Sequence, residues 1–371
     1  MATELSLDLF PPGEYIRDEL DARGWTQEDL ADIMGRPSSF VSKIVGGTKQ
    51  ITRPTSQQLA AAFGTSAELW LNLENAHRLA LEREDHSDIR HRAKIYEKVP
   101  VAELLRRHWM PPCETTDELE REVLAFLEIP TLDAAPQLEA TARKSADYDE
   151  TTASQIAWLC RVKQLADSLP AANFTRARMN KHLESLHALT TSEQELRKVP
   201  AILAEMGIRF LVVQHLPRTK IDGYTLWLDK KRPVIALSLR YDRIDGFWHT
   251  LAHELSHVRH GDQPPIDSNL VGAGRDAPRD DIEERADREA GEWLIPAEQI
   301  QSFIVRTRPR YSKRRIRQFA QLHQIHPGIV AGQLQYRGEI EYRHNREMLV
   351  SVRDIVTETA LTDGWGHVPS L

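Results

Sequence analysis

The chain has 371 residues, two to three times the length of an ordinary domain, so more than one module is expected. It carries 48 Lys and Arg against 55 Asp and Glu, a net charge of −7, which argues against a generally basic protein but allows a local nucleic-acid patch. Apolar residues make up 41% of the chain, enough for a packed core, which excludes wholesale disorder.

Local features indicate a cytoplasmic protein without a membrane partner. No stretch approaches the roughly 18 consecutive apolar residues of a membrane span. Residues 1–10 lack the pattern of a secretory signal. Cys113 and Cys160 are the only cysteines, which fits a reduced compartment and excludes a disulfide framework and a cysteine zinc ribbon.

Periodicity and turn residues divide the chain into four parts. Residues 1–85 predict an all-α helix-turn-helix bundle of five short helices. Residues 86–200 predict a helical connecting region. After Gly207 three short β-type runs precede a long helix, which predicts a small α+β unit with a small sheet over residues 201–335. Residues 336–371 form a C-terminal tail without a further assignment.

The N-terminal bundle concentrates positive charge around its third helix. No acidic residue occurs between residues 33 and 67, although residues 1–80 hold 7 basic and 11 acidic residues in all. In a helix-turn-helix domain the third helix enters the major groove, and screening makes a local basic face matter more than net charge. We therefore expect contacts to operator DNA from short polar and basic side chains, namely Gln27, Arg36, Ser38, Ser39, Ser42, Lys43 and Lys49.

The alternative for these residues is a plain helical bundle with a solvated loop. Four segments favour the functional interpretation because they resemble the HigA/VapI type of antitoxin helix-turn-helix: residues 12–14 (PGE), 25–31 (WTQEDLA), 40–47 (FVSKIVGG) and 64–73 (GTSAELWLNL). The resemblance implies a homodimer on palindromic operator DNA and, in many members, binding of a cognate toxin. Gly46-Gly47 departs mildly from the usual Asn-Gly.

In the second half, residues 253–257 (HELSH) match the H-E-x-x-H pattern. At about 100° per residue, the apolar positions of this helix form one stripe, and His253 and His257 lie nearly opposite, one turn apart. Two neutral imidazoles at this spacing can reach one tetrahedral Zn²⁺ ion, with Glu254 at the edge of the same face as catalytic base. A catalytic zinc site needs a third protein ligand and keeps its fourth position open for water.

Glu283 is the candidate third ligand, on a second helix with its own apolar stripe. Asp287, one turn further, is placed to accept the outer N–H of a ligating histidine and fix its tautomer. Glu284 is the alternative ligand, and Glu283 is favoured by its one-turn spacing to Asp287. His249 and His260 are expected to be exposed or supporting histidines.

Zinc in such a site would lower the pKa of bound water to about 7 and polarise a peptide carbonyl. Glu254 would take the water proton and return it to the leaving amine. We expect residues 234–239 to form an edge strand that aligns an extended substrate by β-addition. Tyr224, Arg240 and Tyr241 are candidate oxyanion donors, and none is preferred.

This half resembles the ImmA/IrrE family of small gluzincin-type metallopeptidases, over roughly residues 200–300 with a looser tail to about 335. The matching segments are residues 222–228 (DGYTLWL), 233–241 (PVIALSLRY), 247–257 (FWHTLAHELSH) and 283–296. The resemblance implies His253, His257 and Glu283 as zinc ligands, Glu254 as base, and cleavage of a partner repressor. Glu289, usually an apolar aromatic, and Ala252, often Phe, depart from the family, and Glu289 is expected to alter packing beneath the third ligand.

A basic run follows, with seven Lys and Arg residues within residues 306–317. One interpretation is a second surface that contacts DNA or an acidic substrate segment. The other, which we prefer, is a helix face exposed to solvent. Residues 319–334 have a helix-turn-helix rhythm.

Together these observations predict an antitoxin-type transcriptional regulator that binds operator DNA and carries a zinc-dependent endopeptidase domain cleaving a regulatory protein. The alternative is a non-catalytic HigA-type antitoxin that binds DNA and a toxin, with the peptidase domain acting as a sensor or scaffold.

Overall fold

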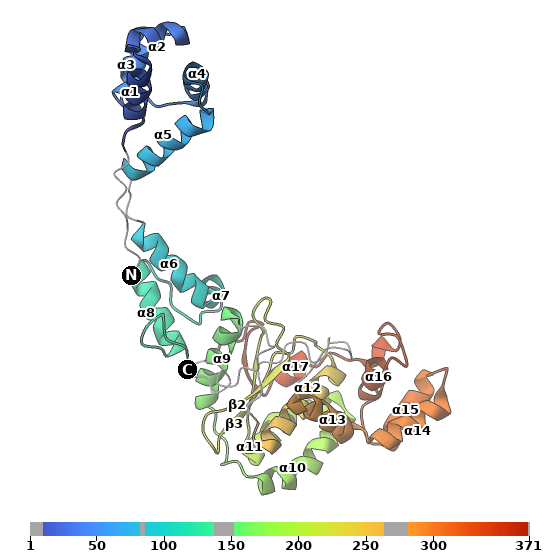
Figure 1. The fold of residues 1–371 in the computed structure, drawn as a ribbon. Coiled ribbons are helices and arrows are strands. Elements are labelled where there is room, and N and C mark those ends of the chain that lie inside the picture. Colours follow the sequence, from blue (N-terminus) through green and yellow to red (C-terminus); the bar gives the residue numbers. More distant parts are fainter. Residues whose placement is uncertain (1–9, 82–85, 137–151, 263–280, 370–371) are drawn as a thin grey trace. The chain divides into compact units, whose positions relative to one another are not determined.

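The computed structural model describes residues 10–81, 86–136, 152–262 and 281–369. The chain forms two compact units, Met1–Asp88 and Ile89–Leu371 (Figure 1). Among the described residues, no helix has the length and apolar character needed to cross a membrane. The expected fold class is confirmed: a helix-turn-helix bundle, a helical middle region, and a small sheet with helices.

Residues 10–81 of the first unit form five helices: α1 Pro12–Arg23, α2 Gln27–Met34, α3 Ser38–Val45, α4 Arg53–Phe63 and α5 Ala67–Leu81. A capping box starts α2, in which the Thr26 hydroxyl accepts from the Asp29 backbone N–H and the Asp29 carboxylate accepts from the Thr26 N–H. The buried core includes Leu30, Ile44 and Trp70. Burial of one apolar stripe from each short helix therefore holds the bundle together.

The region expected to connect the two modules, residues 86–200, contains α6 Ser87–Lys98, α7 Val101–Arg106, α8 Thr116–Leu127, α9 Ala153–Asp167 and α10 Arg176–Ala188, and α11 Val199–Met206 starts at its end. Three strands follow, β1 Arg209–Val213, β2 Gly223–Trp227 and β3 Pro233–Leu237. The remaining elements include α12 Ile244–His260, α13 Asp281–Leu294, α14 Ala297–Thr307, α15 Lys313–Leu322, α16 Pro327–Tyr336, α17 Arg353–Thr357 and β4 Leu361–Asp363.

The four strands form one mixed sheet in the order β2-β3-β1-β4. β1 pairs in parallel with both β3 and β4, while β2 pairs antiparallel with β3. The expectation that residues 234–239 form an edge strand is therefore wrong, because β3 is paired on both sides. The edge strand next to β3 is β2, and the opposite edge is β4.

Both faces of the sheet are buried, and the side-chain alternation of β1 shows how. Phe210 and Val212 belong to one core with residues of α11 and α12, whereas Leu211 and Val213 belong to a second core with residues of α9. Figure 1 shows α9 and α12 on opposite sides of the strands. Strands buried on both faces carry continuous apolar runs, which explains the sequence of β1 and β3.

A buried ion pair ties the middle region and the tail to the same sheet. Arg161 of α9 donates from Nε to Asp363 Oδ2 of β4 at 2.7 Å, and Trp109 Nε1 donates to Asp363 Oδ1 at 3.0 Å. The Arg161 and Asp363 side chains are only 4% and 3% exposed. The boundary at residue 88 lies close to the one expected at 85, while those expected at 200 and 335 do not separate compact units.

The basic run lies on an exposed surface of α14 and α15. Its seven side chains are exposed, and two of them, Arg308 and Lys313, pair with Glu339 and Glu347. α16 is buried along most of its length, from Gly328 to Gln335. It therefore cannot present a recognition surface, and the helix-turn-helix rhythm of residues 319–334 does not form a second DNA-reading motif.

Candidate metal centre and helix-turn-helix surface

Helix α12 brings three polar side chains into an otherwise apolar interior. Its apolar stripe, which includes Trp248 and Leu251, packs on the sheet. His253, Glu254 and His257 lie elsewhere on the helix and are 1%, 2% and 1% exposed. Burial of three ionisable groups on one helix is unfavourable unless they have partners, so their surroundings indicate a functional site.

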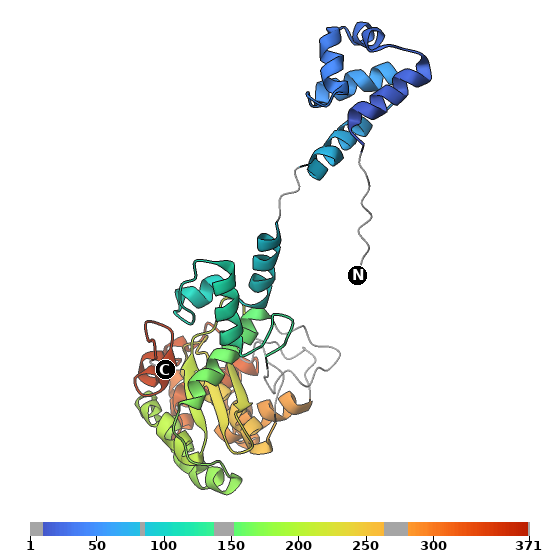
Figure 2. The same cartoon turned by 90° about the vertical axis from the view of Figure 1, so that its left-hand side faces the viewer.

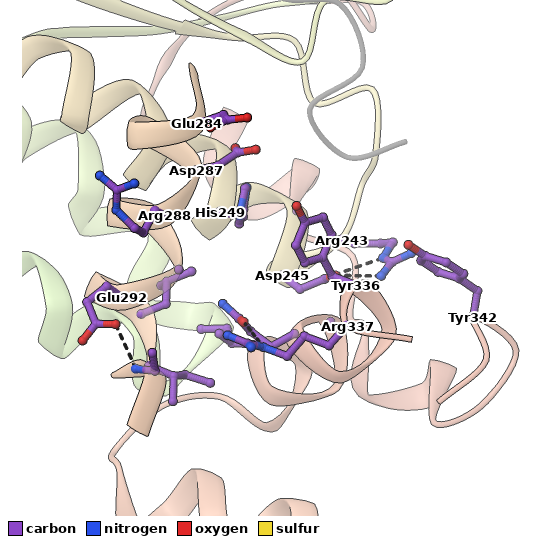
Figure 3. A pocket seen from close by; sticks show the side chains of 18 residues that line it. Arg243, Asp245, His249, Glu284, Asp287, Arg288, Glu292, Tyr336, Arg337 and Tyr342 are labelled. Atoms are coloured by element: carbon purple, nitrogen blue, oxygen red, sulfur yellow. Dashed lines mark hydrogen bonds and ion pairs between the residues drawn. The ribbon is translucent and has the colours of Figure 1, made fainter. Parts of the chain in front are cut away.

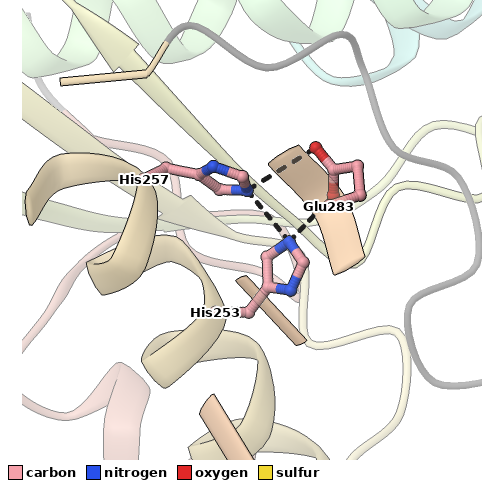
Figure 4. Close-up of side chains that lie close together, drawn as sticks. All are labelled: His253, His257 and Glu283. Carbon is pink, nitrogen blue, oxygen red and sulfur yellow. Dashed lines mark hydrogen bonds and ion pairs between the residues drawn. The ribbon is translucent and has the colours of Figure 1, made fainter. Parts of the chain in front are cut away.

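Glu283 of α13 meets the two histidines across the interface between the helices (Figure 4). His253 Nε2 lies 3.0 Å from Glu283 Oε2 and 3.0 Å from His257 Nε2. His257 Nε2 is 3.6 Å from Glu283 Oε1. Each of the three residues thus offers one ligand atom, and all of these atoms lie within 4.8 Å of one another.

The outer nitrogens of both imidazoles face carboxylates. His253 Nδ1 is 2.9 Å from Asp287 Oδ1, and His257 Nδ1 is 3.3 Å from Asp262 Oδ2. Arg285 donates to the same Asp262 oxygen and holds that carboxylate in place. A carboxylate at Nδ1 keeps the proton on that nitrogen, so the lone pair of each Nε2 points to the common centre.

The donor set fits a divalent metal ion such as zinc. Tetrahedral coordination at zinc–ligand distances of about 2.0–2.2 Å separates ligand atoms by about 3.3 Å, close to the distances observed here. Glu283 Oε1 is buried and has no hydrogen-bond partner. Two converging imidazole lone pairs and an unsatisfied carboxylate oxygen repel one another unless a cation or a proton lies between them.

The pKa values reflect the proximity of these groups. For His257, burial alone lowers the pKa, but the Asp262 and Glu283 carboxylates outweigh it and raise the pKa to about 9. For Glu283, burial alone raises the pKa, but the two imidazoles beside it lower the pKa to about 2. In the metal-free protein at neutral pH, His257 therefore carries the proton that a metal must displace.

Glu254 is held against the edge strand β2. The Thr225 hydroxyl donates to Glu254 Oε2 at 2.7 Å, which orients the carboxylate. A Cβ at Gly223 would lie 2.9 Å from Glu254 Oε1 and 2.6 Å from Thr250 Cγ2, so glycine leaves room for the acid beside the strand. Complete burial raises the pKa of Glu254, partly offset by the nearby histidines. A carboxylate with a raised pKa is suited to accept and return a proton.

The other candidates from the sequence lie outside this cluster. Tyr224 points into the core on the α9 side of the sheet, away from α12, and burial raises its pKa. Arg240 pairs with Asp222 through two hydrogen bonds of 2.7 and 3.2 Å, and Tyr241 is exposed.

Four further residues flank the cluster without joining it. His249 is half-buried, and Glu284 is exposed on α13. His260 is exposed and lies 2.9 Å from Glu289 Oε1, while the Ser256 hydroxyl donates to Glu289 Oε2. Glu289 therefore contacts the C-terminal turns of α12.

Sequence reasoning missed Asp262, Arg285, Thr225 and Gly223. Asp262 directly follows the glycine that ends α12, a position from which a side chain can turn back toward the preceding helical turn. That local signal could have identified Asp262. The contact of Thr225 with Glu254 joins residues 29 positions apart and depends on how β2 packs on α12, which local periodicity does not report.

The DNA-reading candidates of the first unit form one exposed surface around α3. Ser38, Ser39, Ser42 and Lys43 are exposed on α3. Gln27 is half-buried at the start of α2. The cations Arg36 and Lys49 both stack on Phe40, with 5.0 and 4.3 Å from the charged group to the ring centroid. This stacking holds two positive charges beside the exposed face of α3.

Comparison with known proteins matches a segment of each unit to a protein family. Residues 16–70 match the helix-turn-helix family model. The virulence-associated protein I of Dichelobacter nodosus is 33% identical over 79 residues, covering 73% of that protein and 21% of this chain. The antitoxin HigA-1 of Vibrio cholerae is 38% identical over 65 residues, covering 61% of that protein and 17% of this chain. An uncharacterized HTH-type transcriptional regulator of Escherichia coli K12, YddM, is 32% identical over 69 residues, covering 73% of that protein and 19% of this chain.

Residues 207–332 match the IrrE N-terminal-like domain of peptidase family M78. Fold and comparisons thus define a helix-turn-helix protein that also carries a peptidase-family domain. The chain belongs to the VapI- and HigA-like helix-turn-helix family and contains an M78 domain in the same polypeptide. The resemblance expected from the sequence is confirmed for both halves.

Proposed function

We propose that this protein is a DNA-binding regulator whose second unit is a zinc-dependent endopeptidase acting on a regulatory protein. The observation that carries the proposal is the convergence of His253, His257 and Glu283 beside the buried carboxylate of Glu254. The match of residues 207–332 to an M78 peptidase-family domain supports the proposal. The proposal is tested by measuring whether the chain cleaves peptides and whether that cleavage is lost when Glu254 is replaced.

In this proposal His253, His257 and Glu283 hold the zinc, which supplies an acidified water and polarises the scissile carbonyl. Glu254 accepts a proton from the attacking water and returns it to the leaving amine. Thr225 keeps the Glu254 carboxylate directed to the site. Asp287 and Asp262 keep both histidines in the tautomer that a ligand requires.

The edge strand β2 is the proposed guide for the substrate. It carries Gly223 and Thr225, both in contact range of Glu254, and its outer edge has no partner strand among the described residues. An extended peptide that adds to this edge would pass the catalytic carboxylate. β-Addition is thus assigned to β2 in place of residues 234–239.

Metal binding provides the first test. The full-length chain is expected to bind one zinc ion, with an affinity that rises about tenfold per pH unit below pH 9, because His257, with its pKa raised to about 9, must lose a proton. Calorimetric zinc titrations between pH 6 and 8 in buffers of different ionisation enthalpy measure affinity and proton release together. An affinity independent of pH in this interval would contradict the proposed role of His257.

Matched variants separate ligands from neighbours. His253→Ala is expected to abolish zinc binding, and Asp262→Asn to weaken it about 10- to 100-fold through the loss of support for His257. His260→Ala is the control, because this histidine lies on the same helix and contacts Glu289 instead of the cluster. Equal losses in His253→Ala and His260→Ala would reject the ligand assignment.

For the first unit we propose operator binding as a homodimer through the exposed face of α3. The exposed serines and Lys43 supply donors for bases and phosphates, and the Phe40-stacked cations Arg36 and Lys49 add phosphate contacts. The similarity to antitoxin HigA-1 supports a second candidate function: binding a cognate toxin, with the M78 domain as a sensor or scaffold.

DNA binding is expected to respond differently to two substitutions on α3. Lys43→Ala should reduce the slope of log affinity against log salt by about 1, because one phosphate contact is lost. Ser42→Ala should weaken binding about fivefold without changing that slope, because it removes a neutral hydrogen bond. Fluorescence anisotropy with a duplex selected from random DNA measures both. Lys181→Ala, an exposed lysine of α10, is the charge-matched control; unchanged affinity in both α3 variants at every salt concentration would reject this surface.

A further inference from the structure

A cavity of about 390 Å³ lies between α12, α13 and α16 (Figure 3). Its size is typical of sites for small organic molecules. None of the three candidate metal ligands lines it, but Asp287 does, and the same carboxylate lies 2.9 Å from His253 Nδ1. One side chain therefore belongs both to the wall of the cavity and to the support of the metal centre.

The walls combine apolar surface with aromatic rings. Leu294, Ile295 and Ile329 contribute apolar side chains. Tyr336 and Tyr342 also line the cavity, and they are 41% and 58% exposed. Such rings can cover the apolar body of a ligand and attract a cation to their faces.

The charges divide along the cavity. Glu284, Asp287 and His249 lie together at one end with Arg288 of α13 close by, whereas Arg337, directly after α16, lies far from them (Figure 3). Glu284 makes no hydrogen bond or ion pair with another residue in the described ranges. Arg243, which lies further along the cavity, is compensated by Asp245 through hydrogen bonds of 3.0 and 2.7 Å. The end next to the metal centre thus holds two carboxylates beside one guanidinium and one imidazole.

Gly291 lines the cavity at a position where a small side chain fits. A Cβ at this position would meet Gln333 Nε2 at 3.7 Å, an ordinary contact distance. A longer side chain at this position would take up part of the cavity, so substitutions of Gly291 can vary its volume.

We propose that this cavity binds a small organic cation, an amine or guanidinium carried on an aromatic or aliphatic body. The charged group lies against Glu284 and Asp287, and the body lies against Tyr336 and the apolar wall. A cation beside Asp287 opposes the positive charge of a metal held by His253, so the ligand and zinc weaken each other's binding by the same factor. This second part rests on the proposed metal centre, whereas the binding of the cation does not.

The test uses the full-length chain after metal has been removed with a chelator. The chain is titrated with benzamidine as the cation and, separately, with benzoate as an anion of the same shape. Calorimetry is expected to show saturable binding of benzamidine and at least tenfold weaker binding of benzoate. Gly291→Met should fill the cavity and weaken benzamidine binding at least tenfold, while Gly291→Ala retains it. Glu284→Gln, a substitution at an exposed position, should also weaken benzamidine binding. This variant provides the test if Gly291→Met fails to fold. Benzoate binding as tightly as benzamidine, or equal binding in all variants, would overturn the proposal.

Zinc titrations then test the linkage. Saturating benzamidine is expected to weaken zinc binding about tenfold in the wild-type chain and to have no effect in Gly291→Met. Unchanged zinc affinity in the wild-type chain would overturn the linkage. Benzamidine binding in a chain that binds no zinc at all would reject the metal centre and the linkage but support the cation site, so the two failures are distinguishable.

Discussion

A Glu254→Gln variant is expected to cleave peptides about a thousandfold more slowly than the wild-type chain while binding zinc with the same stoichiometry. The amide cannot accept the proton of the attacking water, and general-base catalysis contributes roughly 10²- to 10⁴-fold. Glutamine has nearly the shape of glutamate and can still accept the Thr225 hydrogen bond, so the ligand residues are undisturbed. Mass spectrometry of a peptide library incubated with each zinc-loaded protein measures the effect.

Two controls separate proton transfer from structure in this experiment. Thr225→Val should slow cleavage less than Glu254→Gln, because it removes only the hydrogen bond that orients the base. His260→Ala should cleave at the wild-type rate. Cleavage that persists at full rate in Glu254→Gln rejects Glu254 as the base. If no peptide is cleaved by the zinc-loaded wild-type chain but DNA binding is intact, the antitoxin interpretation with a non-catalytic second unit is favoured.

Asp363→Asn is expected to lower the free energy of unfolding of the second unit by about 3–5 kcal/mol. The substitution keeps the size of the side chain but leaves the buried charge of Arg161 without its counter-ion, 2.7 Å away in the wild-type chain. Removing one partner of a buried pair is much more destabilising than removing an exposed one, because the remaining charge has lost contact with water. Denaturant unfolding followed by tryptophan fluorescence is suited to the measurement, since Trp109 contacts the same aspartate.

Asp167→Asn is the matched control. Asp167 pairs with Arg232 at 2.9 Å, but the two side chains are 69% and 34% exposed. Its loss should change the free energy of unfolding by less than about 1 kcal/mol, as for other surface pairs. Equal effects of the two substitutions would show that the tail does not stabilise the unit through Asp363.

Much of the candidate site follows from short spacings in the sequence. Histidines four residues apart on an amphipathic helix must share one face, which is enough to predict their convergence on one ion. The same spacing between Glu283 and Asp287 places both carboxylates on one side of α13, and the structure brings them to His253. The capping box of α2 is equally local, because it joins residues three positions apart.

The tertiary structure decided which distant segments complete these local patterns. A run of apolar residues cannot reveal its neighbours, so the expectation from the sequence that residues 234–239 form an edge strand was wrong: β3 is internal, and β2 carries the edge beside Glu254. The three residues of β4 are too few for a periodic signal, yet they close the sheet and bring Asp363 to Arg161 across 202 positions. Helix formation depends on neighbours within one turn, whereas strand order and buried ion pairs depend on the packing of the whole unit.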